Sequence, residues 1–198
     1  MRVFLFRHGA VQHTGEKIFL GRTDLPLSAE GRLQAEAWKC HFMGRLRARI
    51  VSSPLSRALE FARTIAGDRA ADVEICRALS EIDLGDWDGQ PMNRIQSADP
   101  ESWRARGKDF ARYRPPGGES FADLQARAVP AFERLVEQAG PGLAVVSHAG
   151  VTRAILCHLL GVPLENLFRI GQDFACLNVL DVSADRTRIN GVNLPCPT

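Results

Sequence analysis

Three segments of the sequence place a basic or imidazole side chain at the end of an apolar run or about one helical turn after it. They read FLFRHG, IVSSPLSR and AVVSHAG, and their chemically active residues are Arg7, His8, Arg57 and His148. Imidazole rings act as nucleophiles or exchange protons, and guanidinium groups bind anions through several hydrogen bonds. An arginine early in a helix, as we expect for Arg57, is unfavourable beside the positive end of the helix dipole unless an anion is nearby. The pattern predicts an anion-binding site, and this site contains two histidines.

Each of these residues also has a structural explanation. A single histidine is more often a surface or structural residue than a catalyst, and we assign that role to His13, His41 and His158. His8 and His148 differ, because each stands between an apolar strand and a glycine, where folding does not require an ionisable ring. Taken together, the histidines and arginines of the three segments favour a functional site.

The elements that must position these residues alternate between strand and helix patterns. Such alternation predicts an α/β three-layer sandwich, in which a mostly parallel central sheet is flanked by helices. Ligands bind beyond the carboxyl ends of the strands in these folds, which is where the three segments place their histidines and arginines. We expect strands at 3–6, 48–53, 72–79, 174–182 and 187–194, the last two forming a hairpin, helices at 27–46, 54–66 and 118–140, and a strand, a sharp turn and a helix within 142–161.

The first expected helix has an indicated start and an indicated apolar face. Ser28 can cap it by accepting a hydrogen bond from the first turn. Leu33, Ala37 and Cys40 or His41 fall at the spacing of one helix face, and we expect this face to pack on the sheet.

Composition limits the classes of protein to which the chain can belong. Its 198 residues suffice for one domain with an insertion. Lysine and arginine number 25 against 23 acidic residues, and the formal charge of +2 excludes the broad basic surface of a nucleic-acid binder. Five scattered cysteines lack metal-ligand spacing, and no segment resembles a signal peptide or reaches the length of a membrane span. We expect a soluble cytoplasmic protein that binds neither nucleic acid nor membrane.

Five ordered blocks, namely FLFRHG, SSPLSRALEFA, LSEIDLGDWDG, PPGGES and VVSHAG, together resemble the histidine phosphatase superfamily, which is also called phosphoglycerate mutase-like. The resemblance spans roughly the whole chain and implies a single domain over residues 1–198. It also implies a reaction without metal or cofactor. The implied site residues are the nucleophile His8, the phosphate clamps Arg7 and Arg57, and the second histidine His148.

Phosphoryl transfer explains why these residue types occur together. The reaction needs an in-line nucleophile, stabilisation of charge on three oxygens, and a proton for the leaving oxygen. A neutral imidazole attacks through one nitrogen while the other carries the proton. We therefore expect a backbone carbonyl just after the strand to hold the second nitrogen of His8.

The resemblance selects Glu81 as the acid that protonates the leaving oxygen and as the base that later activates water. The sequence alone does not rank Glu81 above Asp83, Asp86 or Asp88, which lie in the same polar segment. For these three aspartates we expect the role of ordinary loop carboxylates.

The chain departs from the family pattern near the nucleophile. In RHGAVQHTG, Ala10, Val11 and Thr14 stand where many relatives have polar residues. Thr14 keeps a hydroxyl that can bind a phosphate oxygen. Gly21 and Arg22 match a segment that borders the substrate in relatives, and Arg22 is either a contact for an acidic substrate or a solvated loop residue.

Residues 91–118 form the expected specificity insertion. They fit an amphipathic helix and loop with buried aromatic and solvated charged side chains, or a lid that offers cations and a stacking surface to the substrate. We expect buried aromatic residues, and substrate contacts from Arg112 and Arg114. The basic and aromatic residues of the insertion's second half are Trp103, Arg104, Arg106, Lys108, Phe110, Arg112, Tyr113 and Arg114.

Three functions remain open. The first is a metal-independent phosphomonoester hydrolase that acts on a small phosphorylated metabolite through phosphohistidine. Within the family the chain is most similar to α-ribazole phosphatases and broad-specificity small-molecule phosphatases, so α-ribazole 5′-phosphate is a candidate substrate. The second is a phosphoglycerate mutase. The third is an inactive relative that binds phosphorylated ligands, against which the presence of His8, Glu81 and His148 argues. Assembly as a homodimer is compatible with all three.

Overall fold

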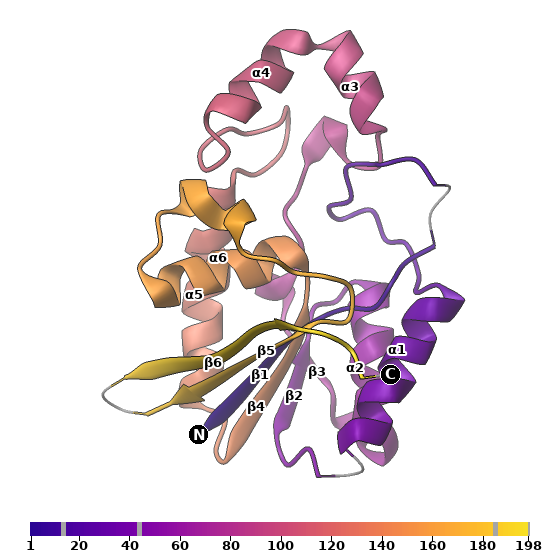
Figure 1. The fold of residues 1–198 in the computed structure, drawn as a ribbon, viewed down its shortest axis with the longest axis vertical. Coiled ribbons are helices and arrows are strands. Elements are labelled where there is room, and N and C mark those ends of the chain that lie inside the picture. The colour runs from indigo at the N-terminus through magenta and orange to yellow at the C-terminus, as the bar shows by residue number, and fades with distance from the viewer. Residues whose placement is uncertain (13–14, 43–44, 184–185, 198) are drawn as a thin grey trace.

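The central sheet contains strands from both ends of the chain. The computed structural model describes residues 1–12, 15–42, 45–183 and 186–197. The strands lie in the order β3-β2-β4-β1-β5-β6 (Figure 1). Their bounds are β1 (Arg2–Arg7), β2 (Arg49–Ser52), β3 (Glu74–Ile75), β4 (Gly142–Ser147), β5 (Leu177–Val182) and β6 (Thr187–Leu194).

The middle of the sheet is parallel and its C-terminal edge is antiparallel. β1 and β4 pair in a parallel register that sets Arg7 opposite Ser147. β2 pairs in parallel with both β4 and β3, whereas β5 is antiparallel to β1 and β6 to β5. Every residue of β4 is buried, as expected for a parallel strand covered on both faces. The predicted mostly parallel sheet and the predicted C-terminal hairpin are confirmed.

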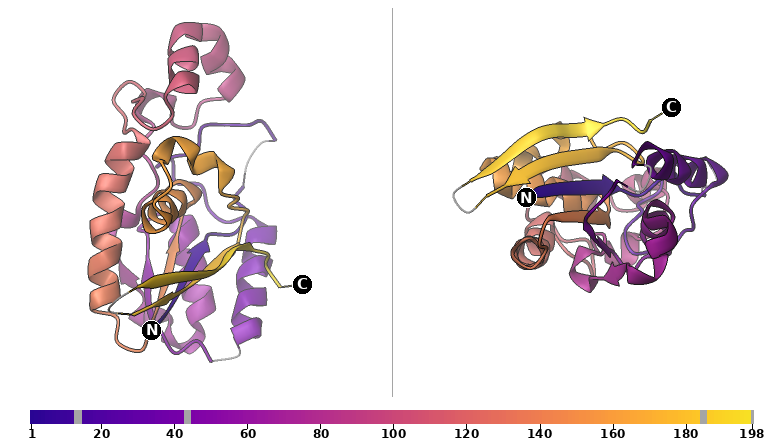
Figure 2. Two further views of the ribbon diagram at one scale, coloured as in Figure 1. Left: turned by 60° about the vertical axis from the view of Figure 1, so that its left-hand side comes forward. Right: turned by 90° about the horizontal axis from the view of Figure 1, so that it is seen from below.

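Helices cover both faces of the sheet, as Figure 2 shows from two directions. Val3 and Leu5 of β1 belong to the core shared with α5 and α6, whereas Phe6 belongs to the core shared with α1 and α2. This distribution confirms the predicted three-layer α/β sandwich. The bounds of these helices are α1 (Ala29–Phe42), α2 (Ser56–Ala66), α5 (Phe121–Glu137) and α6 (Ala149–Leu160).

The helix α1 is shorter than expected and buries a different face. It ends at Phe42, and its buried residues are Gly31, Ala35 and Trp38. Leu33 is 72% exposed, so the inner face predicted from Leu33 is wrong.

Two long-range contacts set the orientation of α1. The indole Nε1 of Trp38 donates to the carbonyl oxygen of Ala175 at 2.7 Å. Gly31 packs so closely on the loop after β1 that a Cβ atom there would lie 2.0 Å from the carbonyl oxygen of Ala10. Neither contact can be derived from local spacing. The predicted cap is present, because Gly31 N donates to Oγ of Ser28 at 3.1 Å.

The segment expected as a strand at 72–79 is mostly not one. β3 contains two residues, both exposed, and a 3₁₀ turn over Arg77–Leu79 follows it. β3 lies at the edge of the sheet, where natural strands are often short. The other 3₁₀ segments are Gly67–Asp72, Gly85–Trp87 and Leu164–Arg169.

Residues 91–118 lie beyond the carboxyl ends of the strands. They form α3 (Met92–Ala98), α4 (Pro100–Lys108) and a loop, and both helices stand at the top of Figure 1, away from the sheet. Trp103 and Tyr113 pack partly buried against the core of α5 and α6, and Phe110 is also only partly buried, so the predicted burial of the aromatic residues is partial. The insertion therefore overhangs the sheet edge at which the predicted site residues gather.

Candidate active site

The carboxyl ends of β1, β4 and β2 bring the predicted residues together. Arg7 ends β1, and the backbone N–H of His8 donates to the carbonyl oxygen of Ser147 in β4 at 3.0 Å. His148 directly precedes α6, and its ring centroid lies 5.1 Å from that of His8. Arg57 lies in the first turn of α2, after β2, and is fully buried. Residues from three separate segments thus form one cluster.

His8 is held through both ring nitrogens. Nδ1 lies 2.8 Å from the carbonyl oxygen of Gly9, and Nε2 lies 3.2 Å from Nε of Arg57. Because a guanidinium only donates, Nε2 is the acceptor and Nδ1 carries the proton. Burial and the charges of Arg57 and Arg7 hold the pKa of His8 well below its ordinary value of 6.5. The ring is therefore neutral at pH 7 with an unprotonated Nε2, and the carbonyl of Gly9 is the acceptor predicted after the strand.

Arg57 is anchored mainly by backbone carbonyls. Its Nη1 donates to the oxygen of Thr23 at 2.8 Å and its Nη2 to the oxygen of Gly21 at 2.7 Å. The carboxylate of Asp24 lies 3.9 Å from Nη1, and burial lowers the pKa of Arg57. A Cβ atom at Gly21 would lie 2.5 Å from the carbonyl oxygen of Ile82. The lack of a side chain at Gly21 therefore lets its backbone pass close to Ile82, while its carbonyl oxygen binds the guanidinium of Arg57.

Two buried nitrogen atoms beside His8 have no hydrogen-bond partner among the described residues, namely Nε of Arg7 and Nδ1 of His148. The rest of each side chain is fixed. Nη1 of Arg7 donates to the carbonyl oxygen of Gln172 at 2.6 Å, and Nε2 of His148 lies 2.7 Å from Oγ of Ser53. Burial lowers the pKa of Arg7 to about 10, so Arg7 stays charged at pH 7. Since buried polar groups are nearly always hydrogen-bonded, these two atoms are suited to bind the oxygens of an anion.

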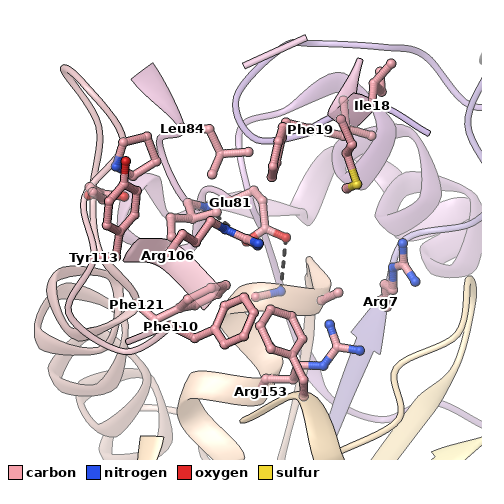
Figure 3. A pocket seen from close by; sticks show the side chains of 18 of the residues that line it. Arg7, Ile18, Phe19, Glu81, Leu84, Arg106, Phe110, Tyr113, Phe121 and Arg153 are labelled. Atoms are coloured by element: carbon pink, nitrogen blue, oxygen red, sulfur yellow. Dashed lines mark hydrogen bonds between the residues drawn. The ribbon is translucent and has the colours of Figure 1, made fainter. Parts of the chain in front are cut away.

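Glu81 lines the same pocket (Figure 3). Its Oε1 accepts from the N–H of Ile82 at 2.9 Å and its Oε2 from the N–H of Gly150 at 3.0 Å. A Cβ atom at Gly150 would lie 2.4 Å from Oε1 of Glu81, so glycine lets the carboxylate approach α6. The neighbouring acids that do not line the pocket are Asp83, Asp86 and Asp88.

Arg7, His8 and Arg57 form one end of a cavity of about 280 Å³, whereas His148 is fully buried and does not line it. Apolar side chains from the loop after β1, from the insertion and from the turn at Leu164–Arg169 form its walls. A charged end with apolar walls suits a phosphorylated small molecule with an organic body. The apolar wall residues include Phe19, Leu84, Met92, Phe110, Tyr113, Phe121 and Phe168.

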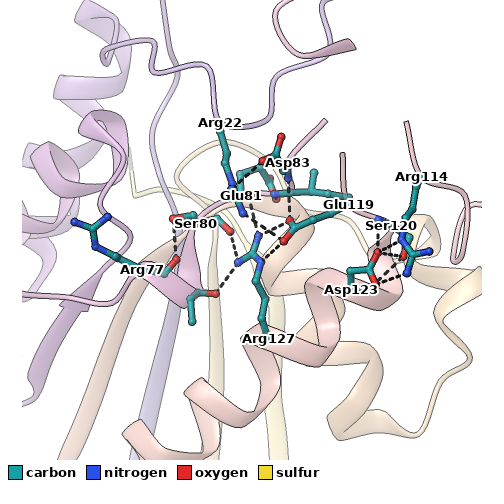
Figure 4. A network of polar contacts seen from close by, with 12 residues as sticks. Arg22, Arg77, Ser80, Glu81, Asp83, Arg114, Glu119, Ser120, Asp123 and Arg127 are labelled. Carbon is teal, nitrogen blue, oxygen red and sulfur yellow. Dashed lines mark hydrogen bonds and ion pairs between the residues drawn. The ribbon is translucent and has the colours of Figure 1, made fainter. Parts of the chain in front are cut away.

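Arg22 lies in a network of ion pairs beside the pocket (Figure 4). It contacts Asp83 at 2.8 Å and Glu119 at 3.3 Å, and Glu119 also pairs with Arg127 at 2.8 Å. Arg127 donates in turn to the carbonyl oxygen of Glu81 at 3.0 Å. Arg22 therefore belongs to the network that supports the Glu81 segment and does not line the pocket.

Arg112 and Arg114 also lie outside the pocket lining. Arg112 pairs with Glu165 at 2.9 Å and Arg114 with Asp123 at 2.6 Å, with the two arginine side chains 71% and 64% exposed. Their predicted contact with substrate stays a prediction without support from this geometry. The predicted phosphate contact of Thr14 lies outside the described residues.

Two further arginines line the pocket and were not selected from the sequence. Arg153 lies in α6, where its Nε donates to the carbonyl oxygen of Ile170 at 2.8 Å. Arg153 is the only arginine or lysine in the helix after His148. A single cation in an otherwise uncharged helix next to a predicted site histidine was a signal that could have selected it from the sequence. Arg106 lies in α4, and its sequence context does not separate it from the other basic residues of the insertion.

Comparisons with known proteins identify the family to which the chain belongs. The model of the histidine phosphatase superfamily (branch 1) matches residues 3–195. The adenosylcobalamin/alpha-ribazole phosphatase of Escherichia coli (strain K12) is 30% identical over 184 residues, which are 92% of this chain and 91% of the relative. The glucosyl-3-phosphoglycerate phosphatase of Mycolicibacterium vanbaalenii is 36% identical over 174 residues, which are 83% of this chain and 76% of the relative. The crystal structure of the alpha-ribazole phosphatase from Shigella flexneri superposes with a TM-score of 0.90 at 27% identity, covering 100% of this chain and 98% of that one.

The chain therefore belongs to the histidine phosphatase superfamily. Within it, the chain is an enzyme that hydrolyses phosphomonoesters of small molecules. In the part of the chain that the structure describes, no three histidine, cysteine, aspartate or glutamate side chains are grouped so that they could hold a metal ion. No described helix is long and apolar enough to cross a membrane.

Proposed function

We propose that hydrolysis proceeds through a phosphohistidine at His8, with Glu81 as acid and then base, and without a metal ion. The observation that supports this is the cluster around His8, which combines an unprotonated Nε2 with two buried nitrogen atoms that lack partners, Nε of Arg7 and Nδ1 of His148. Phosphoryl transfer requires a nucleophile flanked by donors that stabilise charge on the equatorial oxygens.

Arg57 links the binding of substrate to the first chemical step, which is the attack of His8 on phosphorus. Its Nε donates to Nε2 of His8, which is the atom that must attack phosphorus. A phosphoryl dianion is a stronger acceptor than a neutral imidazole, so we expect Nε of Arg57 to turn to a phosphate oxygen and free the lone pair. Attack then forms the N–P bond while the ester P–O bond breaks. The carbonyl of Gly9 stabilises the Nδ1 proton of the resulting cationic ring.

Glu81 completes the reaction by moving protons. In the first step its carboxyl group protonates the leaving oxygen, and the carboxylate that results removes a proton from the water that attacks the phosphohistidine. The two backbone N–H groups that bind Glu81 hold its oxygens at the pocket. The second step breaks the N–P bond, releases inorganic phosphate and returns both His8 and Glu81 to their starting states.

The substrate is a small phosphorylated metabolite, for which we propose α-ribazole 5′-phosphate as one candidate because relatives from two organisms carry that activity in their names. The relative from Mycolicibacterium vanbaalenii is named for a glycosylated phosphoglycerate, which makes phosphorylated sugar acids a second candidate class. Both classes combine a phosphomonoester with a sizeable organic body, as the cavity requires.

Three further expectations are carried forward as proposals. A single domain over residues 1–198 with an insertion at 91–118 is supported by the sheet that contains both terminal strands.

A cytoplasmic location is supported by cysteines that are all free in the structure, with Cys157 and Cys176 buried. A homodimer is supported by the edge position of β6, whose backbone is available for pairing.

The test of the proposed function is phosphate release from a panel of sugar phosphates, phosphoglycerates, nucleotides and α-ribazole 5′-phosphate. We expect release from at least one class, with transient labelling of His8 by substrate that carries labelled phosphate. Isomerisation of phosphoglycerate that depends on a bisphosphate, without net release, would contradict the hydrolase and favour a mutase. Binding without any turnover would favour the inactive relative.

A further inference from the structure

Arg106 forms a cationic part of the pocket wall away from the phosphate cluster. Its guanidinium carbon lies over the rings of Phe19 and Phe110, at 5.1 Å and 4.8 Å from their centroids. All three side chains line the pocket, and Figure 3 shows Arg106 on the side of Glu81 that faces away from Arg7. The rings keep the guanidinium of α4 at the pocket.

The guanidinium of Arg106 has no hydrogen bond or ion pair with any residue that the structure describes. Burial lowers its pKa, which reflects a partly desolvated cation. Contact with aromatic rings stabilises a cation but leaves the N–H groups of the guanidinium without acceptors. A partly buried donor set of this kind is suited to bind an anion from the ligand.

No carboxylate of the pocket lining balances the positive charge of Arg106. Arg7 and Arg57 flank the nucleophile, where the phosphoryl dianion binds, and Glu81 acts favourably on Arg7, Arg57 and Arg153. The other lining carboxylate, Glu119, is already paired outside the lining. A substrate whose only charge is its phosphoryl group would therefore leave a desolvated cation at Arg106.

We propose that Arg106 binds a carboxylate on the organic part of the substrate, so that this enzyme selects phosphomonoesters that carry a carboxylate. This inference rests on the proposed function of the His8 site. A carboxylate accepts two parallel hydrogen bonds along one edge of a guanidinium, in the plane of that group. Such an edge-on ligand is compatible with the rings of Phe19 and Phe110. Phosphorylated acids are accordingly preferred to phosphorylated nucleosides without a second anionic group.

The test uses substrates that differ only in the charge of the organic part. These are phenyl phosphate and its derivatives with a carboxymethyl or a 2-aminoethyl substituent at ring position 3 or 4. The methylene groups insulate the phenol oxygen, so all members have similar leaving groups. We expect kcat/KM to rank carboxylate, neutral and ammonium substrates in that order, with the best carboxylate on the order of 10-fold above phenyl phosphate, as for a hydrogen bond to a charged group.

Variants assign the effect to Arg106. Arg106→Met keeps an unbranched apolar stem between the rings and should bring the three substrates to within about twofold of one another, while Arg106→Glu should reverse the order. The matched control is Arg104→Met, which removes one positive charge from the same helix at an exposed position outside the pocket lining. Arg104→Met should retain the wild-type order.

The outcomes separate the subsite from the proposed function. A wild-type enzyme without preference for the carboxylate, or an equal loss on all three substrates in Arg106→Met, would overturn the subsite while leaving hydrolysis intact. No release from phenyl phosphate or its derivatives, and none from the metabolite panel, would overturn the proposed function. In that case, calorimetric affinities of benzylphosphonate and 4-(carboxymethyl)benzylphosphonate for wild type and Arg106→Met would still decide whether Arg106 binds the carboxylate.

Discussion

Nε of Arg57 donates to Nε2 of His8 over 3.2 Å, and both side chains are buried at the carboxyl end of the sheet. This contact fixes the tautomer of the imidazole, because the ring nitrogen that faces a guanidinium must be the one without a proton. It also aligns the proposed nucleophilic atom with the cation that we propose to bind phosphate. Five predictions follow from the site built around this pair.

The first prediction concerns pH. The pKa values of His8 and His148 are held well below 6.5 in the folded protein, chiefly by burial, whereas the unfolded chain has histidine pKa values of about 6.5. As the pH falls below about 6.5, the unfolded state takes up protons first, so the free energy of unfolding should decrease there and be fully retained above it. Urea denaturation from pH 8 to pH 5 measures this.

The same pair of histidines can be observed directly. Nitrogen NMR of labelled histidine should show His8 as the neutral Nδ1–H tautomer at pH 6.5. A cationic His8 at that pH, or a neutral ring protonated on Nε2, would contradict the site geometry. His8→Asn should weaken the decrease in stability below pH 6.5, because one of the two groups has been removed.

The second prediction concerns the nucleophile. His8→Asn should fold but lose turnover by a factor on the order of 10⁴ or more, because no other group is placed to form the covalent intermediate. Phosphate release and circular dichroism measure the two properties. The control is His158→Asn, at an exposed histidine paired with Glu133, which should keep wild-type activity. Substantial turnover in His8→Asn would assign the nucleophile elsewhere.

The third prediction concerns the anion site. Orthovanadate or phosphate should bind against Arg7, His8, Arg57 and His148, because two buried nitrogen atoms there lack partners. Replacing Arg7 by Met or His148 by Gln should weaken vanadate inhibition by about 10- to 100-fold, the range for hydrogen bonds to charged groups. A crystal structure with vanadate checks the position. An anion bound only near Arg112 and Arg114 would contradict the assignment.

The fourth prediction concerns metal ions. Phosphate release should be unchanged in excess chelator, because arginine and histidine side chains supply the charge stabilisation that metal ions provide in other phosphatases. The measurement is kcat/KM before and after dialysis against chelator, with a metal-dependent phosphatase as the positive control. Activity that disappears with chelator and returns with zinc or magnesium would overturn the proposed mechanism.

The fifth prediction concerns Glu81 and uses the leaving group to separate its two roles. An alkyl phosphate expels a strongly basic alkoxide, so Glu81→Gln should slow its phosphoryl transfer by about 10²- to 10⁴-fold. A nitrophenyl phosphate leaves readily without an acid and should react with His8 at nearly the wild-type rate in a single turnover. The second step then lacks its base, so labelled phosphoenzyme should accumulate after a burst.

A matched control for Glu81 is Asp86→Asn, at an exposed acid of the same segment that does not line the pocket. This variant should behave as wild type on both substrates. Equal losses for alkyl and nitrophenyl phosphates in Glu81→Gln, with no burst, would remove Glu81 from the acid role and move the search to Asp83, Asp86 and Asp88.

The residues that the sequence by itself determined are those whose position follows from their own strand. Arg7, His8 and His148 stand where an apolar run meets a glycine, and Arg57 lies in a helix directly after a strand. In a mostly parallel sheet the carboxyl ends of such strands share one edge, so alternation of strands and helices was enough to bring these residues together. The same alternation predicted the three layers.

The tertiary structure decided which basic side chains face the pocket. Arg112 and Arg114 were predicted to contact substrate, and Arg22 either to do so or to be a solvated loop residue. All three are paired with carboxylates and lie outside the lining. Arg106 and Arg153 line the pocket instead. The ion pair between Arg112 and Glu165, for example, joins residues that are far apart in the chain. Local composition does not reveal such a pair.

Contacts between residues far apart in the chain also explain why α1 buries a different face from the one expected. Trp38 and Gly31 are fixed by contacts with Ala175 and Ala10, and these contacts outweigh the preference of Leu33 for the interior. Local sequence therefore determined where the strands that carry the site residues end and which chemically active side chains follow them. The orientation of each helix and the partner of each arginine depended on long-range packing, because the free energy of burying a tryptophan or pairing a guanidinium is set by residues that are distant in sequence.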